Sequence, residues 1–86
     1  MYILDFFDWF GSIEELEKLD KTVKKNLEGS GVEYLGRFAP YNRNYHWTYF
    51  FKAKDLITWE NARLHIDAGY KRDYKVHTHE IMEFYG

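Results

Sequence analysis

Apolar residues in this 86-residue chain alternate between a strand-like and a helix-like spacing, and the order of these segments limits the possible folds more than any other feature. The first segment, residues 2–10, reads YILDFFDWF and stops at Gly11, which is typical of a strand. Its aromatic side chains fall on both parities, as in a strand that is covered on both faces. We therefore expect a sheet that is shielded from both sides.

The second segment has the spacing of a helix. Ser12 and Glu15 form a capping-box pattern at its start, and Gly29 and Gly31 end it. Asp20 is expected to pair with a lysine one turn later. A single apolar stripe runs along the segment and consists of Ile13, Leu16, Leu19, Val23 and Leu27. This stripe predicts a helix that buries one face.

Two further strands, residues 32–39 and 45–54, flank a turn that contains proline and asparagine, which predicts a hairpin. Alternation places side chains together on one face of each strand: Val32, Tyr34 and Phe38 in the first, and Tyr45, Trp47, Tyr49, Phe51 and Ala53 in the second. Phe50 lies on the opposite face of its strand. Arg37, close to the turn, is expected to be solvated.

A second helix and a last strand complete the chain. Either Asp55 or Thr58 caps the helix. Its stripe consists of Leu56, Trp59, Ala62, Ile66 and Tyr70. Residues 71–75 form a polar connection, and residues 76–85 read as a strand.

The resulting order, β-α-β-β-α-β, is the ferredoxin-like order. With right-handed crossovers it predicts one four-stranded antiparallel sheet, in the order 4-1-3-2, with both helices on one face. The length fits a single α+β domain that spans residues 1–86.

The aromatic content then becomes informative, because two helices cover only one face of such a sheet. Aromatic residues make up 21% of the chain. The other face would measure roughly 400 Å², and an apolar patch of that size usually marks an interaction site. We expect a second copy of the chain to cover it, since symmetric homodimers are the commonest oligomers.

Charge and cysteine content exclude several functions. The net charge of −2 argues against a nucleic-acid partner, and residues 45–52 do not fit the RNA-binding motif of sheet-type RNA-binding domains. The absence of cysteine excludes disulfides, thiolate metal sites and cysteine nucleophiles. No leader pattern and no apolar run long enough for a bilayer is present, so we expect a cytoplasmic protein without a membrane partner.

The strand entry GVEYLGR, residues 31–37, together with the element order, resembles the dimeric α+β-barrel superfamily. The resemblance extends to small uncharacterised members and to proteins of the antibiotic-biosynthesis-monooxygenase type. It implies two ferredoxin-like subunits packed sheet against sheet. It also implies a homodimeric protein that binds a small apolar or aromatic ligand, with cofactor-free oxygenases or isomerases among its relatives. No catalytic residue of a characterised branch is matched, so none is carried over.

Four residues are expected to gather at one end of the sheet. Asp8 ends the first strand, His46 begins the third, and His77 and His79 begin the fourth. In the predicted order the first strand lies between the other two, so these ends meet. A histidine beside a carboxylate can act as a general base without any cofactor, which is the expectation here. His77 and His79, two residues apart on a strand, could alternatively bind Zn or Fe.

Aromatic residues of the third strand, Trp47, Tyr49 and Phe50, are expected to line a ligand pocket beside this cluster. Asp5, a carboxylate in a central strand, is expected to meet a tyrosine hydroxyl, a lysine or the other subunit. The alternative function is a non-catalytic interaction module, in which the aromatic face is only a dimer interface.

Overall fold

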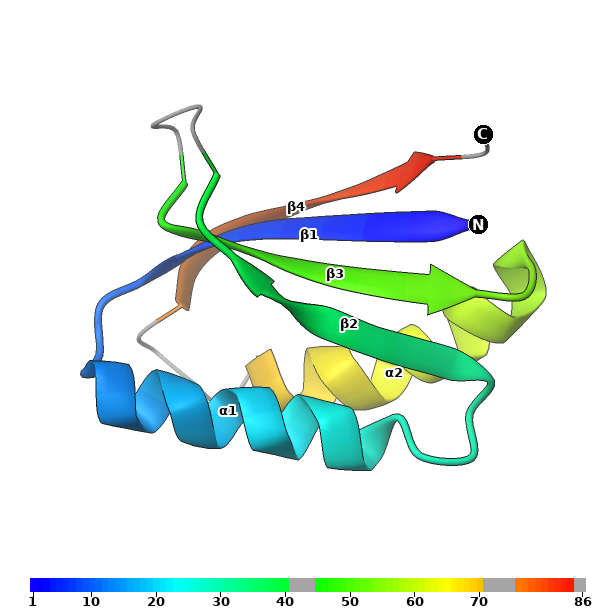
Figure 1. Cartoon of the computed structure of the whole chain (residues 1–86), viewed down its shortest axis with the longest axis horizontal. Coiled ribbons are helices and arrows are strands. Elements are labelled where there is room, and N and C mark those ends of the chain that lie inside the picture. Colours follow the sequence, from blue (N-terminus) through cyan, green and yellow to red (C-terminus); the bar gives the residue numbers. More distant parts are fainter. Residues whose placement is uncertain (41–44, 71–75, 85–86) are drawn as a thin grey trace.

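The computed structural model describes residues 1–40, 45–70 and 76–84, with side chains described for residues 1–40 and 45–64 (Figure 1). The elements are β1 Tyr2–Trp9, α1 Ile13–Asn26, β2 Val32–Phe38, β3 Trp47–Ala53, α2 Leu56–Tyr70 and β4 Val76–Phe84. The predicted α+β class, with two helices and an antiparallel sheet, is confirmed. Neither helix, as far as the chain is described, is long and apolar enough to cross a membrane.

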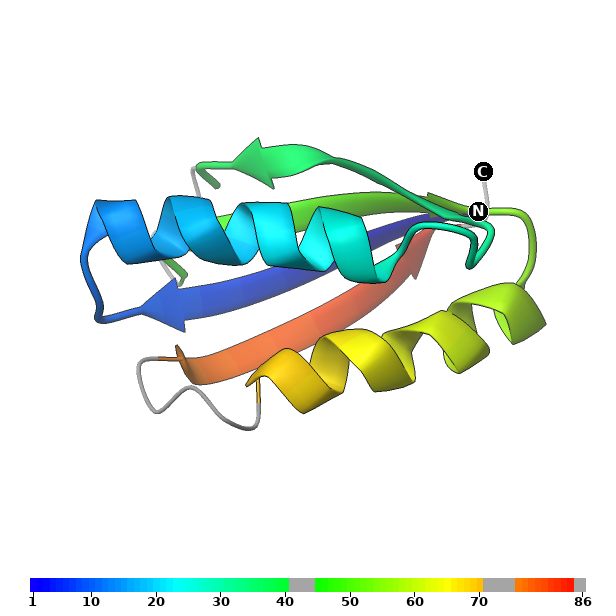
Figure 2. The same cartoon turned by 90° about the horizontal axis from the view of Figure 1, so that it is seen from below.

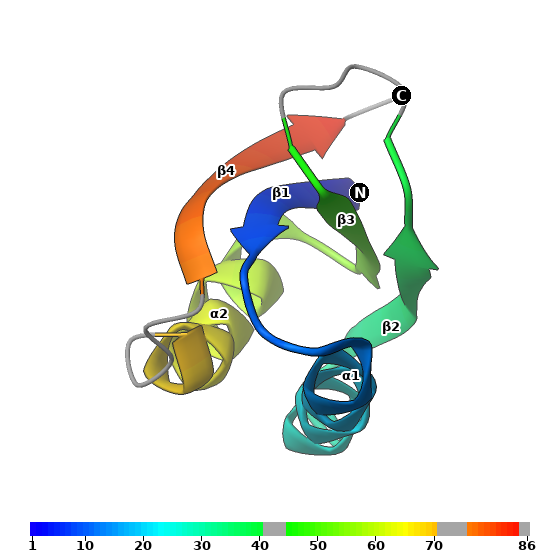
Figure 3. The same ribbon diagram turned by 90° about the vertical axis from the view of Figure 1, so that its left-hand side faces the viewer.

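The sheet has the order β2-β3-β1-β4, and each neighbouring pair is antiparallel. Both helices lie on the same side of it (Figures 2 and 3). We call this side the helix face. No described helix or strand covers the other side, which we call the open face.

The core lies between the helices and the sheet. Alternate residues of β1 are buried there, as are residues of β3 and both helices. The largest of these side chains are Trp59, Tyr49, Phe7, Phe51, Ile3 and Leu16. The other residues of β1 are only partly buried or exposed, because they point to the open face. The two-sided aromatic pattern of β1 therefore reflects one face packed in the core and one face without helical cover.

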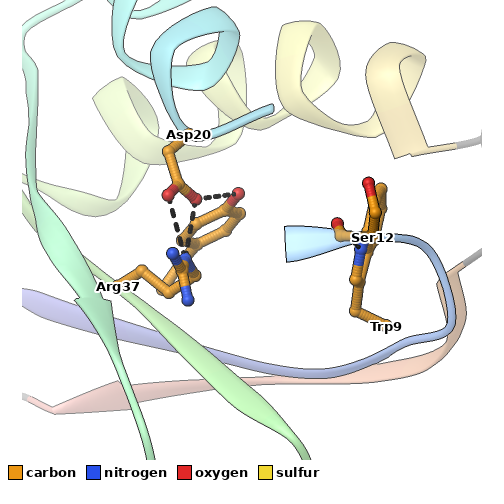
Figure 4. A network of polar contacts seen from close by, with 5 residues as sticks. Trp9, Ser12, Asp20 and Arg37 are labelled. Carbon is orange, nitrogen blue, oxygen red and sulfur yellow. Dashed lines mark hydrogen bonds and ion pairs between the residues drawn. The ribbon is translucent and has the colours of Figure 1, made fainter. Parts of the chain in front are cut away.

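Helix α1 begins as its capping pattern predicts. The Ser12 Oγ accepts a hydrogen bond from the Glu15 N–H at 3.1 Å and donates to the Glu15 Oε1 at 3.2 Å. The Trp9 indole N–H donates to the Ser12 carbonyl at 3.0 Å and ties this cap to the end of β1 (Figure 4). Leu16, Val23 and Leu27 of the predicted stripe are buried and Leu19 is partly buried, whereas Ile13 is 54% exposed. The first turn of α1 thus extends beyond the core.

Helix α2 is capped by Asp55, whose Oδ1 accepts from the Thr58 N–H at 2.8 Å. Trp59 and Ala62 of its predicted stripe are buried, but Leu56 is 44% exposed. The side chains of Ile66 and Tyr70 lie outside the described residues. Ile57 and Leu64, which are outside the stripe, are 74% and 67% exposed.

A bulge in β2 changes which side chains share a face. Tyr34 pairs with Phe51 and Gly36 pairs with Phe50, so Leu35 is the extra residue. After the bulge Arg37 faces the helices, and Phe38 faces the open side, where its ring meets Phe50 at 6.0 Å. The prediction that Phe38 shares a face with Val32 and Tyr34 is therefore wrong.

Strand β3 begins at Trp47, two residues later than predicted. The Tyr45 ring lies 5.8 Å from the ring of Phe6, on the open face. The prediction that Tyr45 shares a face with Trp47 is wrong, because Tyr45 lies before the strand and does not follow its alternation. The other assignments in β3 are confirmed, since Tyr49, Phe51 and Ala53 are buried in the core and Phe50 is on the open face.

Candidate functional site

Asp8 and His46 meet at one end of the sheet, as the sequence predicts. The Asp8 Oδ1 accepts a hydrogen bond from the His46 backbone N–H at 3.0 Å. The same oxygen lies 3.9 Å from the His46 Nδ1, which is too far for a hydrogen bond. Asp8 therefore holds the backbone of His46 and does not orient its imidazole directly.

The His46 ring is bound instead to the backbone of Trp9. Its Nδ1 lies 3.1 Å from the Trp9 nitrogen and 3.0 Å from the Trp9 oxygen. With the proton on Nε2, Nδ1 accepts from the Trp9 N–H; with the proton on Nδ1, it donates to the carbonyl. The side chain is 49% exposed, and its ring meets the exposed Phe10 ring edge-on at 5.4 Å.

The fourth strand starts at the same end of the sheet. In its backbone register with β1, Val76 pairs with Trp9 and His79 with Phe7, so His77 lies between these two pairs. The side chains of His77 and His79 lie outside the described residues, and their catalytic and metal-binding roles stay predictions. Within the described residues, no group of three His, Asp or Glu side chains is arranged to hold a metal ion.

The three residues of the expected pocket do not share one surface. Phe50 lies on the open face, where its ring is 5.5 Å from that of Tyr2. Tyr49 is fully buried on the helix face, and Trp47 lies on that face as well. Only Phe50 of the three can therefore contact a ligand held between two sheets.

A second polar cluster joins α1 to the sheet, and the sequence analysis did not find it. The Arg37 Nε donates to both oxygens of Asp20, at 3.0 and 2.9 Å (Figure 4). The Tyr49 hydroxyl donates to the Asp20 Oδ1 at 2.8 Å. The Arg37 Cζ lies 4.2 Å above the centre of a Trp47 ring. Asp20 thus connects α1 with β2 and β3.

This cluster favours the neutral form of two tyrosines. Burial, followed by the charge of Asp20, raises the pKa of Tyr34 to about 12, although Arg37 acts in the opposite direction. Burial and the Asp20 carboxylate also raise the pKa of Tyr49, well above that of an ordinary tyrosine. Both phenols therefore stay protonated at neutral pH and can act as hydrogen-bond donors.

The cluster was missed for a specific reason. If side chains alternated strictly along β2 from Tyr34, Arg37 would lie on the opposite face of the strand. The bulge shifts the alternation by one residue, so both side chains point toward α1. Gly36, with a φ of 145°, is the one local signal, because a glycine inside a strand often marks a bulge. Asp20 consequently binds Arg37 and not a lysine of its own helix.

Asp5 is 1% exposed and lies opposite Tyr49 in the register of β1 and β3. Its side chain lies on the helix face of β1, with the buried residues Ile3 and Phe7. The identity of its partner stays a prediction.

The open face carries two groups of aromatic rings that are in contact with one another within each group. Tyr2 contacts Phe50, Phe50 contacts Phe38, and Phe6 contacts Tyr45, with ring centres 5.5 to 6.0 Å apart. Phe38 is 51% exposed and Tyr2 is 36% exposed. The Lys52 Nζ lies 5.7 Å from the Tyr2 ring. Neither helix covers this face of the sheet.

In comparisons with known proteins, no family model matches the chain and no curated protein matches it. The candidate sites therefore rest on their own geometry.

Proposed function

We propose that this chain is a homodimeric interaction module of the dimeric α+β-barrel type, in which ferredoxin-like subunits pack open face against open face. The observation that supports it is the row of partly exposed rings formed by Tyr2, Phe50 and Phe38. Burying such rings against a second copy removes apolar surface from water and stabilises the pair.

The size of the face supports a second copy as its partner. Four strands at about 4.8 Å spacing and about 24 Å length give a projected area of roughly 450 Å². The accessible area of a face with protruding rings is larger than its projected area, and a standard interface buries roughly 800 Å² per partner. A two-fold arrangement also needs no other protein, because each copy presents the same surface.

A second function is favoured by the contact between Asp8 and His46. These residues lie at one end of the open face, next to the rings of Phe6 and Tyr45. In this alternative the dimer encloses a small apolar or aromatic ligand, and the exposed His46 imidazole acts on it as a general base, as in a cofactor-free oxygenase or isomerase.

The proposal is tested by the mass of the protein in solution at micromolar concentration. Light scattering should give twice the 10.5 kDa mass of the chain. Phe38→Glu should give a monomer, because it places a charge within the row of rings that the proposed interface buries. Ile57→Glu is the matched control, since Ile57 is 74% exposed on α2, away from the open face, and should leave the dimer intact.

A monomeric wild-type chain, or a Phe38→Glu dimer as stable as the control, would contradict the proposal. Circular dichroism checks that both variants stay folded. Native mass spectrometry separates the two functions: a bare dimer supports the interaction module, and a dimer with an added small mass supports the ligand-binding alternative.

A further inference from the structure

The last turn of α1 and the start of β2, which the chain joins through a short turn (Figure 1), line a groove. Its volume is about 440 Å³, which is in the range of small-molecule sites. Leu27 and Val32 form its apolar floor, and both are almost fully buried. Tyr34 lines it as well. The groove therefore offers apolar contact to the body of a ligand.

Ser30 holds the turn at the end of the groove in shape. Its backbone N–H and its hydroxyl both donate to the Leu27 carbonyl, at 3.1 and 2.6 Å, and its Oγ accepts from the Val32 N–H at 3.1 Å. Gly29 lines the groove, and no atom beyond its chain neighbours lies within 4 Å of the place that a Cβ would take. The turn is thus fixed by its own hydrogen bonds while its surface stays open, so a ligand pays little to order it.

The charged residues that line the groove are mainly acidic. Glu28 lines it from the α1 side and Glu33 from β2, and Lys24 is the basic residue among them. Within the part of the chain that the structure describes, neither glutamate takes part in an ion pair. Their charges are therefore not neutralised by a protein partner there. Such a lining attracts a cation and repels an anion.

We propose that this groove binds a small organic monocation with an apolar body, of the class of primary ammonium ions on an aromatic or aliphatic chain. Glu28 and Glu33 attract the ammonium group from the two walls, and the body lies against Leu27 and Val32. Lys24 opposes this attraction and limits the affinity. The site lies on the helix side of the sheet and does not depend on the proposed dimer.

NMR titration of the full chain with 2-phenylethylamine tests the inference, because this amine is protonated at neutral pH. We expect saturable shifts of the backbone amides of residues 27–34. The uncharged 2-phenylethanol should bind about tenfold more weakly, since two partly exposed charge contacts are lost. The anion 3-phenylpropionate should bind more weakly still. Added salt should weaken binding of the amine but not of the alcohol, because salt screens exposed charges.

Substitutions of the charged residues locate the site. Glu28→Gln and Glu33→Gln should each weaken binding of the amine about threefold and leave binding of the alcohol unchanged. Glu17→Gln, exposed on α1 and outside the groove lining, is the matched control and should change neither. Lys24→Gln should strengthen binding of the amine about threefold, whereas Lys25→Gln, also outside the lining, should change it less.

The absence of saturable shifts at residues 27–34 would overturn the inference. Equal affinities for the amine and the alcohol would overturn it too, as would a Glu28→Gln/Glu33→Gln double variant that binds the amine as tightly as the wild type. Both glutamates are exposed, so the double variant should stay folded, which circular dichroism checks. Loss of the preference for the amine in this variant, with binding of the alcohol retained, would support the inference.

Discussion

Asp20 connects helix α1 to two strands through its carboxylate. Its carboxylate accepts two hydrogen bonds from Arg37 and one from Tyr49, and its side chain is only 18% exposed. Hydrogen bonds of this kind are stronger than those between neutral groups. The rings of Tyr34 and Tyr49 pack edge-on beside it, with centres 5.6 Å apart. One carboxylate thus organises a cluster in which burial, together with the charge of Asp20, keeps two phenols neutral.

This cluster predicts that the protein loses stability in alkaline solution. The pKa of Tyr34 is raised from its ordinary value of 10.0 to about 12 in the folded chain, so folding favours its protonated form. That stabilisation is complete below pH 10.0 and is lost as the pH rises through about 12. Urea unfolding should therefore show a falling free energy of unfolding across this window.

Two variants identify the source of the alkaline loss. Tyr34→Phe should show a smaller fall over the same window, because it has no phenol to ionise. Tyr2→Phe, which removes a hydroxyl from the exposed open face, should behave like the wild type. An equal slope in the wild type and in Tyr34→Phe would contradict the assignment.

At the scale of elements, the bulge in β2 decides where several side chains point. It turns Arg37 toward α1 and Phe38 toward the open face, so it serves both the buried cluster and the proposed interface. Gly36 permits the bulge, because a φ of 145° is strained for any residue with a Cβ. The edge strand is therefore shaped by one glycine.

Gly36→Ala is expected to destabilise the protein by about 1–3 kcal/mol. The added Cβ would lie 3.4 Å from the Phe38 ring, which is an ordinary van der Waals contact, so the expected cost comes from the backbone strain. Gly29→Ala is the comparison, since its φ is +75° and nothing lies within 4 Å of the added Cβ, so it should cost less. Chemical denaturation measures both, and an equal loss in the two variants would argue against a special role for the bulge.

At the scale of the whole molecule, a chain of 86 residues has a small core and a large surface. The helices cover one face of the sheet, and the rings of the open face remain partly exposed. A second copy would cover them, and folding would then be coupled to association.

This coupling predicts that stability depends on protein concentration. If the dimer unfolds to two chains, each tenfold increase in concentration should raise the apparent free energy of unfolding by about 1.4 kcal/mol. The urea midpoint of the wild type and of Ile57→Glu should therefore rise with concentration, whereas that of Phe38→Glu should not. A wild-type midpoint that is independent of concentration would contradict a dimer.

The sequence analysis located most elements of the fold. The capping box at Ser12, the apolar stripe after it and the aromatic runs depend on neighbours close in the chain, so they could be recognised locally. The meeting of Asp8 with His46 followed from strand order alone. The assignments of Phe38 and Tyr45 failed because alternation holds only inside a regular strand.

By itself, then, the sequence determined the α+β class, the position of the helices and strands, and the excess of aromatic residues, because hydrophobic spacing and capping act over a few residues. Only the tertiary structure decided that Arg37 and Tyr49 meet at Asp20, and that Tyr49 is buried while Phe38 is exposed. Those contacts depend on the register between β2 and β3 and on a bulge that shifts it by one residue. Such a shift exchanges the two faces of a strand without changing its hydrophobic content.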